Sequence, residues 1–73
     1  MRYRELTRQL TDLGCRELPS RHRGSHRRWV NDATGGRASI PDWGSKDLRL
    51  GTIRSALRQL GIDWRVVLRD RND

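Results

Sequence analysis

The sequence has a single cysteine, Cys15, a single lysine, Lys46, and no long run of apolar residues. One cysteine cannot form a disulfide within the chain, and Cys15 next to Leu13 and Gly14 is typical of a small buried residue. No segment approaches the roughly 20 apolar residues that span a bilayer. The charged residues after Met1 do not resemble a signal peptide. These absences argue against a disulfide-stabilised or membrane protein, and we expect a cytoplasmic one.

The chain has 73 residues, so residues 1–73 are predicted to form one small domain. A domain of this size buries only about 60% of its unfolded surface, which favours a shallow site over a deep pocket for a cofactor. We therefore expect no cofactor.

The charge is strongly positive, with 16 Lys+Arg against 9 Asp+Glu and a net charge of +7. Nearly all the cations are arginines, whose planar fork of donors suits phosphate. This balance predicts a polyanionic partner, which is a nucleic acid, an acidic membrane or an acidic protein. A soluble, arginine-rich protein without such a partner is the alternative.

Two segments have the apolar spacing of amphipathic helices. In residues 3–13, Tyr3, Leu6, Leu10 and Leu13 fall on one face, and Gly14 is placed to end the helix. A second helix is predicted to begin between Leu48 and Thr52, which could cap it, and to end at Gly61. Its apolar face consists of Ile53, Ala56, Leu57 and Leu60. Asp63 is predicted to cap a short third helix whose apolar face consists of Trp64, Val67 and Leu68.

Three strands are predicted between the two long helices. Residues 15–23 indicate a weak strand, and Pro19 favours either a sheet edge or a bulge near this residue because proline lacks a backbone donor. Residues 25–31 alternate, so that one face carries His26, Arg28 and Val30 and the other carries Arg27, Trp29 and Asn31. Turn residues occupy positions 31–36, and a third strand occupies 37–41, with Ala38 and Ile40 on one face and Arg37 and Ser39 on the other.

The order is therefore α-β-β-β-α, which predicts an α+β fold. Each long helix has a single apolar face, so both are expected to cover the same face of a three-stranded antiparallel sheet and to leave the other face open.

His26 is the candidate catalytic residue, because histidine can transfer a proton near neutral pH. In RNA the ribose 2′-OH is a nucleophile already positioned beside the phosphorus, so a proton-transfer group and cations are sufficient for cleavage. Gly24 and Ser25 could offer an N–H group and a hydroxyl to a phosphate oxygen. An exposed strand histidine without a chemical role is equally compatible with the spacing.

Further residues are candidates for contact with phosphate or base. Lys46 and Arg49 precede the second long helix, where cations and helix N–H groups together favour phosphate. Trp43 lies in a polar loop and could stack on a base or contact a protein partner. The predicted RNA-binding residues are Arg21, Arg23, Gly24, Ser25, Arg27, Arg28, Lys46 and Arg49.

A metal site is not predicted, and the second histidine has a weaker case. The chain has one cysteine, and His22 and His26 lie four residues apart on a predicted strand and turn, not on one helical face. His22 lies in a charged connection, where a solvated side chain is the usual outcome, although it could supply a second proton-transfer group.

The chain resembles the HicA family of toxin mRNA interferases over nearly its whole length. The matching features are the helix ending in Leu13-Gly14, the segment RHRGSHRRW at 21–29, Thr34-Gly35, Ile40-Pro41, the segment KDLRLGTIR at 46–54 and the segment LRQLGI at 57–62. After Ile40-Pro41 the family often carries another histidine, and here Asp42 and Trp43 stand there.

The resemblance implies a fold like that of a double-stranded-RNA-binding domain and the activity of an endoribonuclease that cleaves mRNA. It places the catalytic histidine at His26. It also implies a cognate HicB-type antitoxin that covers the site, and an acidic surface on that partner would fit the charge of +7.

Two other functions fit parts of the sequence. A non-catalytic double-stranded-RNA-binding module would use the first helix, the connection at 21–25 and the region of Lys46 and Arg49 to read duplex shape. A DNA-binding helix-turn-helix would use the two C-terminal helices around Gly61, but the second of these is short and rich in apolar residues.

Overall fold

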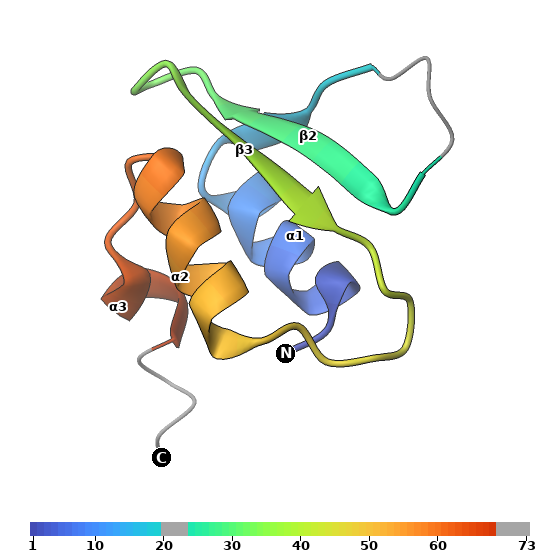
Figure 1. Ribbon diagram of the computed structural model, residues 1–73. Coiled ribbons are helices and arrows are strands. Elements are labelled where there is room, and N and C mark those ends of the chain that lie inside the picture. Colours follow the sequence, from blue (N-terminus) through green and yellow to red (C-terminus); the bar gives the residue numbers. More distant parts are fainter. Residues whose placement is uncertain (20–23, 69–73) are drawn as a thin grey trace.

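A three-stranded sheet has both long helices packed against one of its faces (Figure 1). The structure is a computed structural model that describes residues 1–19 and 24–68. Its elements are α1 (Tyr3–Asp12), β1 (Cys15–Glu17), β2 (His26–Asn31), β3 (Gly36–Pro41), α2 (Leu50–Gln59) and α3 (Trp64–Leu68). The strands pair antiparallel in the order β1-β2-β3. The predicted α+β class and element order, including the short third helix, are confirmed.

The first strand is shorter than predicted. It ends at Glu17, although the backbone N–H of Leu18 still donates to the carbonyl of Arg28 at 2.8 Å. Pro19 follows, and because the N–H of Leu18 faces β2, the missing N–H of Pro19 would point to the open edge of the sheet, where proline is tolerated. As predicted, β1 is an edge strand. The rest of the predicted strand, residues 20–23, lies outside the described residues.

The core lies between the sheet and the helices. Every element contributes at least one buried side chain to it, because each strand and helix has one apolar face to bury. The side chains with almost no exposure are Leu6, Leu10, Ile40, Ile53, Leu57 and Leu60. These are positions that the spacing of apolar residues predicts for the two long helices and β3. Leu13, which the same spacing assigned to the apolar face, is instead 41% exposed, because α1 ends at Asp12 and Leu13 lies at its C-terminal cap.

A hydrogen bond between two buried aromatic side chains joins α1 to β2. The indole Nε1–H of Trp29 donates to the hydroxyl of Tyr3 at 3.0 Å, and the two side chains are 6% and 8% exposed. Burial raises the pKa of the Tyr3 phenol above its usual 10.0, while the bond from Trp29 lowers this pKa. The pair satisfies a donor that would otherwise be buried without a partner.

Tyr3→Phe is expected to lower the free energy of unfolding by about 1–3 kcal/mol, because it leaves the buried indole N–H without an acceptor. The raised pKa of Tyr3 has a second consequence. Its stabilising contribution is complete below the unfolded pKa and is lost as the pH rises through the folded pKa. Urea unfolding at neutral pH and at about pH 11 should therefore show less alkaline destabilisation in Tyr3→Phe than in the parent. An equal loss in both proteins would contradict this assignment.

The turn between β2 and β3 is fastened to the end of α2. Asn31 is buried, its Nδ2 donates to the carbonyl of Leu60 at 2.9 Å, and its Oδ1 accepts from the N–H of Ala33 at 3.1 Å. The hydroxyl of Thr34 donates to the same carbonyl at 2.9 Å. Gly61 follows with φ +72° and ends the helix as predicted. The carbonyl of Leu60, at the end of this helix, is thereby satisfied by two side chains from the turn.

Thr52 does not cap α2, contrary to one of the predicted starts. The helix begins at Leu50 with Arg49 as the N-cap residue, and no side chain bonds to its first turn. The preceding loop is held against α1 instead. The N–H of Leu48 donates to the carbonyl of Met1 at 2.8 Å, and Asp47 forms a bridge with Arg2. Leu48 is buried, so this tertiary contact decides where the helix starts.

Candidate functional site

The face of the sheet that the helices leave uncovered carries most of the candidate residues. We call it the open face, and its side chains follow from strand alternation, since Trp29, Ala38 and Ile40 point into the core. The register aligns Arg16, Val30 and Arg37 in one row, and Arg28 with Ser39 in the next. The open face therefore carries the exposed side chains of Arg16, His26, Arg28, Arg37 and Ser39, together with Val30 and Pro41, which are buried.

His26 is the first residue of β2, and its side chain is exposed. Its Nδ1 lies 3.4 Å from the hydroxyl oxygen of Ser39, which stands on the neighbouring strand opposite Arg28. This contact is at the long end of the hydrogen-bond range, and it orients the ring through one nitrogen. Within residues 1–19 and 24–68, no hydrogen bond to Nε2 occurs. Because the side chain is exposed, this second nitrogen is available to a ligand.

Arg28 and Arg37 provide positive charge on the same face of the sheet as His26, with Arg28 two residues from it and Arg37 opposite Val30. Among the residues that the structure describes, neither guanidinium pairs with a carboxylate. Both side chains are exposed and stand on the same face as the imidazole. Because arginine remains charged at every physiological pH, this face can attract and hold an anion such as a phosphate group.

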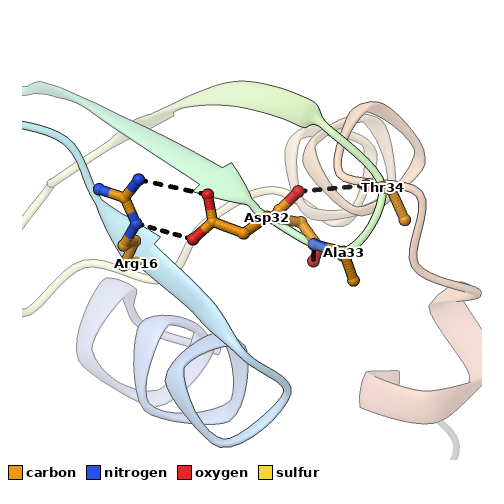
Figure 2. Close-up of polar contacts among 5 residues, drawn as sticks. Arg16, Asp32, Ala33 and Thr34 are labelled. Carbon is orange, nitrogen blue, oxygen red and sulfur yellow. Dashed lines mark hydrogen bonds and ion pairs between the residues drawn. The ribbon is translucent and has the colours of Figure 1, made fainter.

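The third arginine of the open face is already paired. Figure 2 shows the guanidinium of Arg16 facing the carboxylate of Asp32, with contacts of 2.8 Å from Nε and 3.2 Å from Nη2. These hydrogen bonds lower the pKa of Asp32 and raise that of Arg16. The positive charge of Arg16 is therefore largely compensated, and the available cations of this face are Arg28, two residues from His26, and Arg37, in the row of Arg16.

Arg27 does not lie with His26. Alternation places it on the opposite face of β2, and its Nη1 is 3.5 Å from the Glu17 carboxylate on β1. Both side chains remain partly exposed because they lie beyond the area that the helices cover. Sequence reasoning grouped Arg27 with the RNA-binding residues, but the structure does not bring it to the face that carries the imidazole.

Gly24 and Ser25 lie immediately before β2, at the same end of the sheet as His26. The carbonyl of Ser25 accepts a hydrogen bond from the N–H of Asp42, which continues the pairing of His26 with Pro41. Nothing lies within 4 Å of the position that a Cβ atom on Gly24 would occupy, so a ligand can approach this backbone closely.

The loop between β3 and α2 begins at this same end of the sheet (Figure 1). Four of its residues, Trp43, Lys46, Asp47 and Arg49, line a hollow of about 470 Å³. Trp43 is 38% exposed, which is unusual for the largest apolar side chain, whereas Trp29 is in the core, as predicted. Lys46 and Arg49 are exposed and carry the positive charge of this hollow.

The remaining candidates fall into two groups. Arg21, His22 and Arg23 lie outside the described residues. Cys15 is buried and burial raises the pKa of its thiol, which disfavours the nucleophilic thiolate.

No group of three His, Cys, Asp or Glu side chains suited to a metal ion occurs within residues 1–19 and 24–68. In the same residues no helix has the length and apolar character needed to cross a membrane.

The structure adds residues that sequence reasoning did not include in the site. Ser39 contacts His26, and Arg37 stands on the same face. Alternation already separated both from the apolar side of β3, but only the strand register shows that Ser39 lies beside the imidazole. The arrangement combines an accessible proton-transfer group with unpaired cations and has the features of a site that acts on a phosphate ester.

Comparison with known proteins agrees with this architecture. A family model described as the HicA toxin of bacterial toxin-antitoxin matches residues 3–62, which include both long helices and the whole sheet. No curated protein and no solved structure matches the chain. Because the match extends over most of the 73 residues, the chain belongs to the HicA toxin family, and its role is that of the toxin in a toxin–antitoxin pair with a cognate antitoxin as partner.

Proposed function

We propose that this toxin is an endoribonuclease that cleaves mRNA without a metal ion, with His26 as its general acid or base. The observation that supports the proposal is the position of the imidazole. It is exposed and contacts Ser39 through Nδ1, and it stands on the face that carries Arg28 and Arg37. A proton-transfer group beside unpaired cations is what phosphodiester cleavage in RNA requires.

In the proposed reaction the 2′-oxygen of the ribose attacks the adjacent phosphorus while the bond from phosphorus to the 5′-oxygen breaks. The proton of the 2′-OH passes to a base, and the departing 5′-oxygen receives a proton. The products are a 2′,3′-cyclic phosphate and a 5′-hydroxyl. His26 transfers one of these protons, and water or the substrate supplies the other proton-transfer group.

The surrounding residues bind the phosphoryl oxygens in this proposal. Arg28 lies two residues from His26 on the same strand face. Gly24, with its exposed backbone, and Ser25, with its hydroxyl, directly precede His26. In this proposal, Lys46 and Arg49 bind phosphates of the RNA that lie further from the cleaved bond. Arg27 then contributes long-range attraction, since its guanidinium is paired with Glu17 on the other face. We place this activity in the cytoplasm, where mRNA is present.

The chemistry of the products tests the proposed function. RNA incubated with the purified protein and a chelator is expected to yield fragments with 2′,3′-cyclic phosphate and 5′-hydroxyl ends. The same RNA with 2′-O-methyl groups should remain intact, because it lacks the attacking hydroxyl. Fragments with 5′-phosphate ends, or cleavage of the methylated RNA, would show a different reaction.

Duplex RNA binding without cleavage is the second candidate function. The feature that favours it is a shallow hollow of about 320 Å³ on the exposed side of α1, lined by Arg4, Thr7, Arg8, Thr11 and Asp12. A helix face with arginines and hydroxyls can contact the minor groove of duplex RNA. This function predicts salt-dependent binding to duplex RNA with no cleavage products.

A further inference from the structure

We infer that the hollow at Trp43 is a stacking site for an unpaired base of single-stranded RNA, next to the proposed cleavage site. The inference rests on the proposed function and specifies its substrate: RNA whose bases are free to leave the stack. It concerns the loop from Asp42 to Arg49, which the chemistry assigned to His26 does not use.

The first step is the exposure of Trp43. Its side chain is 38% exposed on a chain whose other tryptophans are buried or half-buried, and it lies in a hollow of about 470 Å³. Ligand sites in proteins commonly have volumes of about 300–1,000 Å³. A large aromatic surface exposed in such a hollow is the usual feature with which proteins hold a base.

The second step is that the backbone holds Trp43 in place. The carboxylate of Asp42 accepts the N–H of Gly44 at 3.0 Å, and the carbonyl of Trp43 accepts the N–H of Lys46 at 3.2 Å. Gly44 has φ +62°, which a residue with a side chain rarely adopts, so the turn depends on this glycine. The indole is therefore presented by a turn that is ordered before any ligand binds, which lowers the entropic cost of binding.

The third step is the charge of the hollow. Lys46 and Arg49 share it with Trp43, and its one carboxylate, that of Asp47, lies 3.1 Å from the amino group of Met1. The negative charge of Asp47 is thus offset, and the hollow as a whole favours an anion. A nucleotide combines a flat aromatic base with a phosphate, which are the two groups that this lining accommodates.

The fourth step is the position of the hollow. His26 pairs with Pro41 across the sheet, and Trp43 follows two residues later. Paired Cα atoms lie about 5 Å apart, and two residues span at most about 7 Å, so the Cα atoms of His26 and Trp43 are within about 12 Å. Stacked nucleotides rise about 3.4 Å each, so one strand of roughly three or four nucleotides reaches both residues. Bases within a duplex already stack on each other, so this site selects unpaired RNA.

Binding of 2′-O-methyl oligoribonucleotides, which resist attack by a 2′-OH, tests the inference without cleavage. Trp43→Ala is expected to weaken binding of a single-stranded oligoribonucleotide by about 5- to 150-fold, the effect of losing one base–aromatic stack. Trp43→Phe should retain part of the affinity. Affinity for a duplex of the same sequence should not change. Leu13→Ala is the matched control, since Leu13 is a similarly exposed apolar residue, at 41%, at the end of α1.

Three outcomes would overturn the inference: parental affinity of Trp43→Ala for the single strand, an equal loss for single strand and duplex, or a loss of antitoxin binding alone, which would make the hollow a protein contact. The test is separate from that of the proposed function. If the parent cleaves RNA and Trp43→Ala binds normally, only the stacking site is wrong. If the parent yields no cyclic phosphate ends, the cleavage proposal fails, and the binding comparison still decides the stacking site.

Discussion

His26→Ala is expected to reduce the rate of RNA cleavage by about 10²- to 10⁴-fold, the usual contribution of a positioned acid or base. The fold should persist, because the side chain is exposed and its hydrogen-bond partner within residues 1–19 and 24–68 is Ser39, at 3.4 Å. Initial rates on a single-stranded RNA, measured together with thermal unfolding and antitoxin binding, separate a loss of chemistry from a loss of structure. Cleavage by His26→Ala at the parental rate would refute the assignment.

Two further variants show how the imidazole acts. Ser39→Ala removes the contact to Nδ1 but keeps the ring, so a smaller loss is expected, together with a changed dependence of the rate on pH if Ser39 positions the imidazole. His22→Ala tests whether a second histidine takes part. A loss as large as that of His26→Ala would identify the two imidazoles as acid and base, whereas a small loss leaves water or substrate in the second role.

Gly36→Ala is expected to cause a large loss of stability, of about 3 kcal/mol or more, which is at the upper end for overpacking. A Cβ atom on Gly36 would overlap the carbonyl oxygen of Gln59 and lie 3.0 Å from the Cα of Leu60. These are backbone atoms at the end of α2, which cannot move aside as a flexible side chain would. Chemical unfolding of the variant and the parent measures the difference in the free energy of unfolding.

Gly51→Ala is the matched control for this prediction. Gly51 lies in α2, and nothing is within 4 Å of the position that its Cβ atom would occupy. Alanine is favoured over glycine in a helix by up to about 1 kcal/mol, so this variant should be as stable as the parent or more stable. A small effect of Gly36→Ala, similar to that of Gly51→Ala, would show that the turn and the helix end do not meet as described.

Much of the fold is predictable from local patterns. Tyr3, Leu6 and Leu10 recur at helical spacing, and Trp29 alternates with exposed residues, so the sequence indicates both the elements and their buried faces. The errors lie at the ends of elements. Thr52 has the chemistry of a cap but does not serve as one, since the packing of Leu48 and its bond to Met1 set the start of α2. A contact between distant segments leaves no local signal.

The candidate site was only partly predictable for the same reason. Alternation along β2 separates His26 and Arg28 from Arg27, so the face of the imidazole follows from the sequence. The partners of these side chains do not follow from the sequence, because the pairing of Arg27 with Glu17 and the contact of His26 with Ser39 depend on strand register.

Asn31 shows this limit most clearly. In the sequence it is an ordinary turn residue, but in the fold it is buried and bonded to the carbonyl of Leu60, far along the chain. Turn propensity is a local property, whereas the burial of an amide depends on which helix end packs against the turn.

The sequence by itself determined the element order, most of the buried faces, the positive charge and the leading candidate imidazole, because periodicity and composition are properties of the chain. Tertiary structure decided which groups meet. It placed Ser39 beside His26 and Arg28 and Arg37 on the same face, paired Arg27 with Glu17, and held Trp43 in an exposed hollow with Lys46 and Arg49. These outcomes depend on register and packing between segments distant in sequence, and a pattern within one segment does not encode them.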